Sequence, residues 1–180
     1  MKSVLFLLAL FFINPIYSQT NFTWDISDTI SKSKDQIYSD VKLFVAKSWK
    51  SANHVIQNDD KDAGVVLVRG VIAKSFSFLG AGYAYDYSYI VTFRMKDGKY
   101  KFTIDNVYCE KAYMTTSSYY IPKVEPFDGD NCPETGTFKK PGPPAKRLIP
   151  MMASVKMDLQ SIYDVFQVAI REPSLKDGDW

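Results

Sequence analysis

Any acid–base or nucleophilic catalysis by this chain of 180 residues would centre on His54, because the sequence contains one histidine. The imidazole follows a segment with helical spacing and lies next to Asn53, where polar residues commonly close a helix. We therefore expect His54 to be structural or solvent-facing, and a hydrolase that uses it is the alternative. One histidine and two cysteines also give fewer ligands than a structural zinc site ordinarily requires.

The acidic segment NDDKDAG, with Asp59, Asp60 and Asp62, offers carboxylates that could bind calcium or serve a hydrolase. It lacks the ligand spacing of an EF-hand, and acidic segments that end in glycine are ordinary turns. We expect a turn here. A second acidic segment, DGDNCPE, has Cys132 where the next oxygen ligand would belong. The sequence therefore predicts no metal site and no cofactor.

Aromatic residues alternate through GYAYDYSYIVTF, which begins at Gly82 and could be either a ligand-stacking platform or the inner side of a strand. The Asp97-Gly98 turn that follows predicts a hairpin in which Lys96 lies opposite Lys99. An exposed surface this apolar would be sticky, so we expect the rings in the core. Tyr83 and Tyr85, nearest the glycines, are expected to keep their hydroxyls in water. The predicted partners are Met95 with Tyr100, Phe93 with Phe102, Val91 with Ile104, and Tyr87 with Tyr108.

The reverse face of this hairpin carries mostly polar side chains, and we expect it to be open to solvent. A long stretch rich in proline and glycine, at about residues 110–148, is expected to be an irregular surface loop that carries two adjacent tyrosines. These two surfaces supply the candidate contacts for a ligand or partner. The residues are Arg69, Arg94, Lys101, Tyr119 and Tyr120, with Thr92 and Thr103 on the same open face.

The first residues have the pattern of a secretory signal peptide. Lys2 supplies the positive charge, Val4 to Ile13 form a short apolar run, and the small residue Ser18 follows a proline. We expect residues 1–18 to be removed and the protein to be periplasmic or extracellular. No other stretch is long and apolar enough to predict a transmembrane segment.

Export makes a disulfide between Cys109 and Cys132 plausible, because exported proteins meet oxidising conditions. Two separate thiols are equally consistent with the sequence, since spacing alone does not fix the geometry. Removing the leader, in which Lys2 is the only charged residue, lowers the formal net charge from +2 to +1. Such a balance argues against nucleic acid as a partner.

The remaining patterns predict an α+β domain at residues 19–173, followed by a tail at 174–180. An edge strand is expected at 21–27, a helix at 34–51 with Ser33 and Gln36 as a capping box, and a second helix from Pro150. Between the helices the chain favours four consecutive strands. The expected fold is an antiparallel sheet of about five strands, in β-α-β-β-β-β-α order, with two helices packed on one face.

The segment DQIYSDVKLFVAKSWKSANHVIQNDDKDAGVVLVRG resembles an exported bacterial family of the Bacteroidetes type. Its shared features are a helix ending near Trp49, then VIQ, an acidic turn, a glycine, and an apolar strand closing on Arg69-Gly70. The family is domain of unknown function 4468, with a TBP-like fold. The resemblance implies that fold, and it brings no catalytic or ligand-binding residues with it.

The sequence therefore favours a non-catalytic binding or interaction module of the cell envelope. Its partner would be an unidentified protein or small molecule. An envelope hydrolase that uses His54 or the acidic turn is the alternative, and a purely structural envelope component is a third reading.

Overall fold

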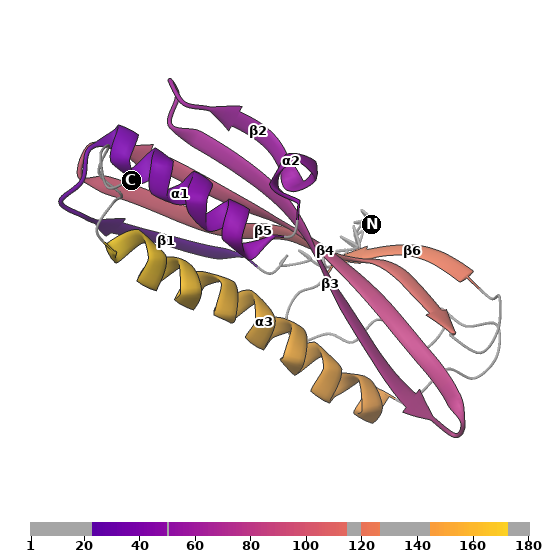
Figure 1. Cartoon of the computed structure of the whole chain (residues 1–180). Coiled ribbons are helices and arrows are strands. Elements are labelled where there is room, and N and C mark those ends of the chain that lie inside the picture. The colour runs from indigo at the N-terminus through magenta and orange to yellow at the C-terminus, as the bar shows by residue number, and fades with distance from the viewer. Residues whose placement is uncertain (1–22, 50, 115–119, 127–144, 173–180) are drawn as a thin grey trace, which may run out of the picture.

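The computed structural model describes residues 23–49, 51–114, 120–126 and 145–172, and within them it has the predicted α+β architecture (Figure 1). The predicted leader, the tail at 174–180, Tyr119 and Cys132 lie outside the described residues. The elements in chain order are β1 (Trp24–Thr29), α1 (Lys34–Ser48), α2 (Ala52–Val55), β2 (Ile56–Asp60), β3 (Val65–Phe78), β4 (Ala81–Lys96), β5 (Lys99–Met114), β6 (Tyr120–Pro126) and α3 (Ala145–Arg171).

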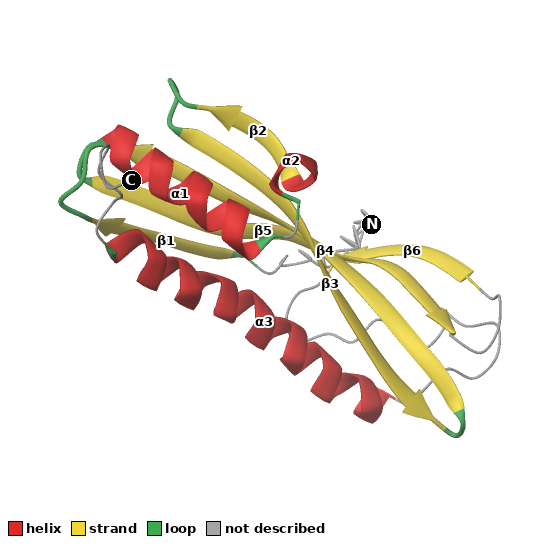
Figure 2. Ribbon diagram, in the orientation of Figure 1, coloured by secondary structure: helices red, strands yellow, loops and turns green. Residues whose placement is uncertain are grey.

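The sheet is antiparallel throughout and its strand order is β1-β5-β4-β3-β2. The sixth strand, β6, also pairs with β5, but beyond the part of β5 that β1 covers. Figure 2 shows that β3, β4 and β5 continue past the short strands β1 and β2 into a twisted arm, which β6 joins. The predicted five-stranded sheet with two principal helices is confirmed, and β6 is an addition to it.

Helix α1 starts where the sequence predicts, because the capping box at Ser33 forms. The Ser33 hydroxyl accepts a hydrogen bond from the Gln36 N–H at 3.3 Å, and the Gln36 side chain accepts one from the Ser33 N–H at 2.9 Å. The helix ends at Ser48 rather than at Ser51, because Trp49 has extended backbone angles and α2 forms a separate turn. Trp49 packs edge-on against Phe44, with ring centroids 5.7 Å apart.

Helix α3 begins at Ala145, so the prediction that Pro150 lies in its first turn is wrong. A proline inside a helix forgoes one backbone hydrogen bond, here to the carbonyl of Lys146. After Pro150 the helix buries its apolar stripe against the sheet. Met152, Val155, Leu159, Phe166 and Ile170 all lie in the core.

The core forms between the sheet and the two long helices, and Phe166 of α3 lies at its centre. Its ring contacts Phe44 of α1, Phe93 of β4 and Phe102 of β5, with centroids 5.0–5.3 Å apart. Tyr87, Phe93 and Phe102 are each at most 1% exposed. We call the alternating aromatic residues from Tyr83 to Phe93 the aromatic row, and its interpretation as core is therefore confirmed.

The predicted hairpin register holds near the turn and fails farther away. Met95–Tyr100, Phe93–Phe102 and Val91–Ile104 pair as predicted. Tyr87 lies opposite Cys109 rather than Tyr108, because the register shifts between Ser88 and Ile90 and Asn106 adopts a φ of 50°. The extra residue turns Val107 and Cys109 inward, and both are buried.

The prediction of a water-exposed hydroxyl is wrong for Tyr85, and the Tyr83 side chain is also largely buried. Tyr83 is 6% and Tyr85 2% exposed, and the Tyr85 hydroxyl oxygen is buried. Phe76 of β3 stacks on both rings, with centroids 5.5 and 6.1 Å away. The aromatic row therefore stays covered along its whole length.

The expected irregular loop at about 110–148 contains regular structure at both ends and in the middle. β5 continues to Met114, β6 occupies Tyr120–Pro126, and α3 takes up the end of the stretch from Ala145. The prolines of β6, Pro122 and Pro126, are tolerated because β6 has a partner on only one side among the described strands. Residues 115–119 and 127–144 lie outside the described part of the chain.

Candidate functional site

A group of four cationic side chains marks the sheet near the β4–β5 turn, on the face opposite α1 and α3, here called the outer face. Arg94 pairs across the strands with Lys101, and Lys96 pairs with Lys99, so all four side chains lie on this face. We call these four residues the basic patch. On the neighbouring strand β1, Ser27 lies opposite Lys101 and Thr29 opposite Lys99, which adds two hydroxyls to the same surface.

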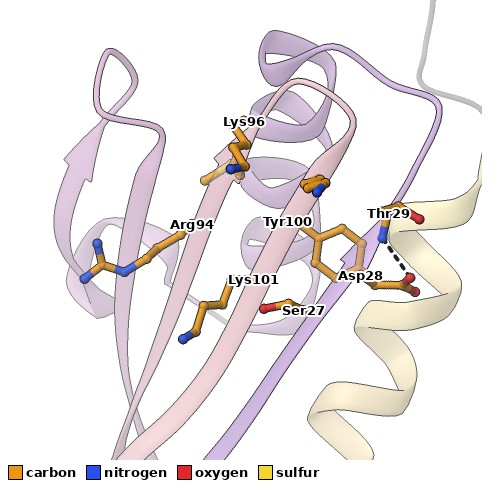
Figure 3. Close-up of a pocket in the computed structure, with 9 residues that line it drawn as sticks. Ser27, Asp28, Thr29, Arg94, Lys96, Tyr100 and Lys101 are labelled. Atoms are coloured by element: carbon orange, nitrogen blue, oxygen red, sulfur yellow. Dashed lines mark hydrogen bonds between the residues drawn. The ribbon is translucent and has the colours of Figure 1, made fainter.

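The basic patch lines a shallow depression with a volume of about 500 Å³ (Figure 3). Ser27 and Thr29 line its β1 side, and the strands beneath contribute Asp28, Met95 and Tyr100. Figure 3 shows the side chains of Arg94 and Lys101 extending in the same direction from neighbouring strands. Arg94, Lys96 and Lys99 are exposed, so their charges are open to a ligand from solvent.

The positive charge of the basic patch is only partly balanced. Lys101 Nζ lies 2.7 Å from Asp25 Oδ2, and both side chains are about half exposed. Within the described residues no carboxylate lies within ion-pair distance of Arg94, Lys96 or Lys99. Like charges on adjacent strands repel one another, and an anion in the depression would relieve that repulsion.

The Asp28 carboxylate, which also lines the depression, is held by other groups. It accepts hydrogen bonds from its neighbour, the Thr29 N–H, at 2.7 Å and from the Arg171 guanidinium at 2.8 Å. The Thr29 N–H bond first, and then Arg171, lower the pKa of Asp28. The carboxylate therefore stays ionised and tied to the end of α3, so it leaves the four cations largely unneutralised.

Comparison with known proteins places this fold in a family. Residues 25–110 match the family described as domain of unknown function (DUF4468) with TBP-like fold. These residues are similar to that family's domain. The match contains β1 except for Trp24, β2 to β4, and the part of β5 that carries Lys99 and Lys101, and therefore the whole basic patch.

Two crystal structures share the fold of this chain. A TBP-like protein from Parabacteroides distasonis has a TM-score of 0.62 and 12% identity, and the alignment covers 88% of this chain and 97% of that chain. A DUF4468 family protein from Bacteroides ovatus has a TM-score of 0.56 and 14% identity, covering 88% of this chain and 91% of that one. No curated protein matches the chain. At such identities the similarity shows the fold alone.

Of the predicted contact residues, the structure brings Arg94 and Lys101 together and separates Arg69 from them. Arg69 lies on β3 opposite Ile90, four residues along β4 from Arg94, which corresponds to about 14 Å. Its guanidinium donates to the carboxylate of Glu110 on β5. Arg69 is therefore engaged in an ion pair and does not belong to the basic patch.

Tyr119 lies outside the described residues, so its predicted contact role stays a prediction. Tyr120 begins β6 opposite Tyr113, and the direction of its side chain is likewise not described. The predicted disulfide also stays a prediction, because Cys132 lies outside the described part of the chain. Cys109 itself is buried, 4% exposed, on β5.

Sequence reasoning missed Lys96 and Lys99 as candidate contacts. The signal was present in the predicted hairpin, since the Asp97-Gly98 turn pairs these two lysines in register with Arg94 and Lys101. What the sequence lacked was the position of β1, which brings Ser27 and Thr29 to the same surface from a segment about 70 residues away.

Two features were considered for a hydrolase, His54 and the acidic segment, and the structure describes both. His54 is exposed on the one-turn helix α2, and no described side chain forms a hydrogen bond with its ring. Asp60 accepts a hydrogen bond from the Ala63 N–H at 2.8 Å, which forms the predicted turn before β3. The described residues contain no group of three or more His, Cys, Asp or Glu side chains that could hold a metal ion.

The first acidic residue of this segment, Asp59, connects β2 to α1. It accepts a hydrogen bond from the Tyr38 hydroxyl at 2.5 Å and another from the Lys42 ammonium. The bond to Asp59 is the main reason that the pKa of Tyr38 rises to about 12. Partial burial raises the pKa of Asp59, but the bonds from Lys42 and Tyr38 outweigh it and hold that pKa below its ordinary value.

Among the described helices, including the 27-residue α3, none combines the length and apolar character needed to cross a membrane.

Proposed function

We propose that this protein is a non-catalytic, exported binding module of the cell envelope, and that its basic patch binds an anionic group. The observation that carries the proposal is the convergence of Arg94, Lys96, Lys99 and Lys101 on one depression with a single described carboxylate partner, Asp25. Export is supported by the leader-type pattern of Lys2 and the apolar run from Val4 to Ile13.

The chemistry of the basic patch favours phosphate, sulfate or carboxylate groups. Arginine and lysine donate charge-assisted hydrogen bonds to such groups, and the hydroxyls of Ser27 and Thr29 add neutral donors at the same surface. A depression of about 500 Å³ is within the usual range for small-ligand sites. The basic patch and the two hydroxyls supply hydrogen-bond donors and positive charges, and such groups are suited to binding an anion.

The exposure of the basic patch sets the expected strength and salt dependence of binding. An exposed ion pair typically contributes roughly 0.2–1 kcal/mol, so one charge on the ligand gives weak binding. A ligand with two or more negative charges a few ångströms apart would contact both cross-strand pairs together. Screening at about 0.15 M salt acts over roughly 8 Å, so affinity should fall as ionic strength rises.

The proposal is tested by calorimetric titration of the purified protein with pyrophosphate at low and high salt. We expect binding to weaken at least about fivefold in the double variant Lys96→Ala/Lys99→Ala, because half of the basic patch is removed. The matched control is Lys47→Ala/Lys156→Ala, which makes the same chemical change at exposed positions on α1 and α3. Equal affinity in the two double variants would show that net charge, and not this depression, attracts the anion.

A further inference from the structure

The distal half of β3 has an open edge. β2 pairs with β3 only at Val65–Val68, while β4 pairs with β3 along its whole length. Among the described strands none pairs with the other side of β3 from Val71 to Ser77. Figure 1 shows this part of β3 at the outer side of the arm that β3 and β4 form. Its backbone N–H and C=O groups on that side can therefore accept another strand.

This edge lacks the features that usually prevent strand pairing. The β3–β4 register is continuous from Val65 to Phe78, so no bulge bends the edge away. The exposed outer-face residues along it are Val71, Ala73, Ser75 and Ser77, which are small or apolar and uncharged. The stretch contains no proline, and its one charged side chain, Lys74, alternates to the other face.

Lys74 is also neutralised by α3. Its ammonium lies 2.7 Å from the Asp158 carboxylate and 2.6 Å from the Ser154 hydroxyl. A lysine on an edge strand commonly discourages pairing because its charge must be desolvated, but this charge is already partnered within the chain. The edge therefore presents no unbalanced charge to an incoming strand.

The exposed residues of this edge are complementary to a second copy of themselves. In an antiparallel pairing centred on Ser75, Ser75 lies opposite its own copy, and Ala73 of each copy lies opposite Ser77 of the other. Val71, 53% exposed, then lies next to the β3–β4 turn of the other copy, where Leu79 is 89% exposed. The register places no like charges opposite each other.

We propose that β3 pairs antiparallel with β3 of a second copy of this chain, centred on Ser75, to form a two-fold symmetric dimer with one continuous sheet. The symmetry axis is perpendicular to the sheet, so the outer faces of both copies lie on the same side. Each copy carries its basic patch at the end of the sheet far from the dimer contact. The dimer is consequently able to hold two anionic groups of one long ligand, although the pairing itself does not depend on anion binding.

Sedimentation velocity over a wide range of protein concentrations tests the dimer. We expect a concentration-dependent dimer, and we expect Ser75→Lys to raise its dissociation constant at least tenfold, because two ammonium groups would face each other at the axis. The control Ala63→Lys adds the same charge at an exposed position in the turn before β3 and should leave the dimer intact. Circular dichroism verifies that both variants remain folded.

Hydrogen exchange identifies the surface that forms the dimer. Backbone amides of Val71–Ser77 that point to the open edge should exchange more slowly at high protein concentration, and Ser75→Lys should abolish this difference. A wild-type protein that stays monomeric at all concentrations would overturn the proposal. So would a dimer that Ser75→Lys leaves unchanged, or one in which the protection appears elsewhere. Pyrophosphate binding is measured separately, so failure of either proposal leaves the other intact.

Discussion

Arg94 and Arg69 lie on the same face of the same sheet, and their partners give them different roles. Arg69 is paired with Glu110, whereas no described carboxylate lies within ion-pair distance of Arg94. We predict that Arg94→Ala weakens pyrophosphate binding about two- to fivefold, which corresponds to ~0.4–1 kcal/mol. Arg69→Ala, the same substitution outside the basic patch, should change the affinity by less than about a factor of two. A calorimetric result with the reverse order would exclude the basic patch as the site.

Tyr38 provides a residue-level test of the contact between α1 and β2. Its pKa is raised to about 12 chiefly by the hydrogen bond to Asp59, so the folded state retains the phenolic proton longer than the unfolded state does. The resulting stabilisation is fully present below pH 10 and is lost as the pH rises from about 10 through 12. We predict a steeper loss of stability over that window for the wild type than for Tyr38→Phe.

The measurement for Tyr38 is urea unfolding at several pH values between 9 and 12. Tyr38→Phe is the matched variant because it keeps the ring and removes only the hydroxyl. Spectrophotometric titration of Asp59→Asn should show one tyrosine whose pKa has moved back towards 10. Parallel stability curves for the wild type and Tyr38→Phe would show that the bond to Asp59 has no influence in solution.

At the scale of the elements, the β3–β4 ladder depends on the absence of a side chain at Gly70. A Cβ built there would lie 2.2 Å from the Tyr89 ring, so the ring covers the glycine backbone closely. A glycine inside a strand often marks a bulge or a close approach of neighbouring atoms, and here the structure shows a close approach within a continuous register. This contact fixes Tyr89 of the aromatic row over its neighbouring strand.

We predict that Gly70→Ala lowers the free energy of unfolding by about 1–3 kcal/mol, because the ring must move to admit a methyl group. Tyr89→Leu removes the obstructing ring, so Gly70→Ala should cost clearly less in that background. The two single variants and the double variant form a cycle that urea denaturation can measure. Additive costs would mean that the ring does not limit residue 70.

The elements that could be predicted from sequence are those fixed by local chemistry. The Ser33 capping box marked the start of α1, and the Asp97-Gly98 turn set the register of the β4–β5 hairpin near the turn. The elements that were missed depend on distant partners. β6 requires the far half of β5, and the register shift near Asn106 has no marker such as a glycine in the sequence. Pro150 misled the prediction of α3 because a proline can also lie inside a helix, where it forgoes one backbone hydrogen bond.

In the molecule as a whole, the two faces of the sheet differ in composition and in role. The inner face buries the aromatic rings against α1 and α3, and this arrangement follows from the period-two pattern of β4 and the helical stripe of α3. The outer face holds charged residues whose grouping depends on strand order. Arg94 and Lys101 could therefore be predicted as open-face residues, but the full basic patch with Ser27 and Thr29 required the position of β1.

The most direct test of the central claim, that the basic patch binds anions, is an NMR titration of the isotope-labelled protein with pyrophosphate. We expect saturable shifts of the amides from Arg94 to Lys101 and of Ser27 and Thr29, which diminish as salt is added. Shifts that are absent, or that are spread over the helices as strongly as over this end of the sheet, would contradict it.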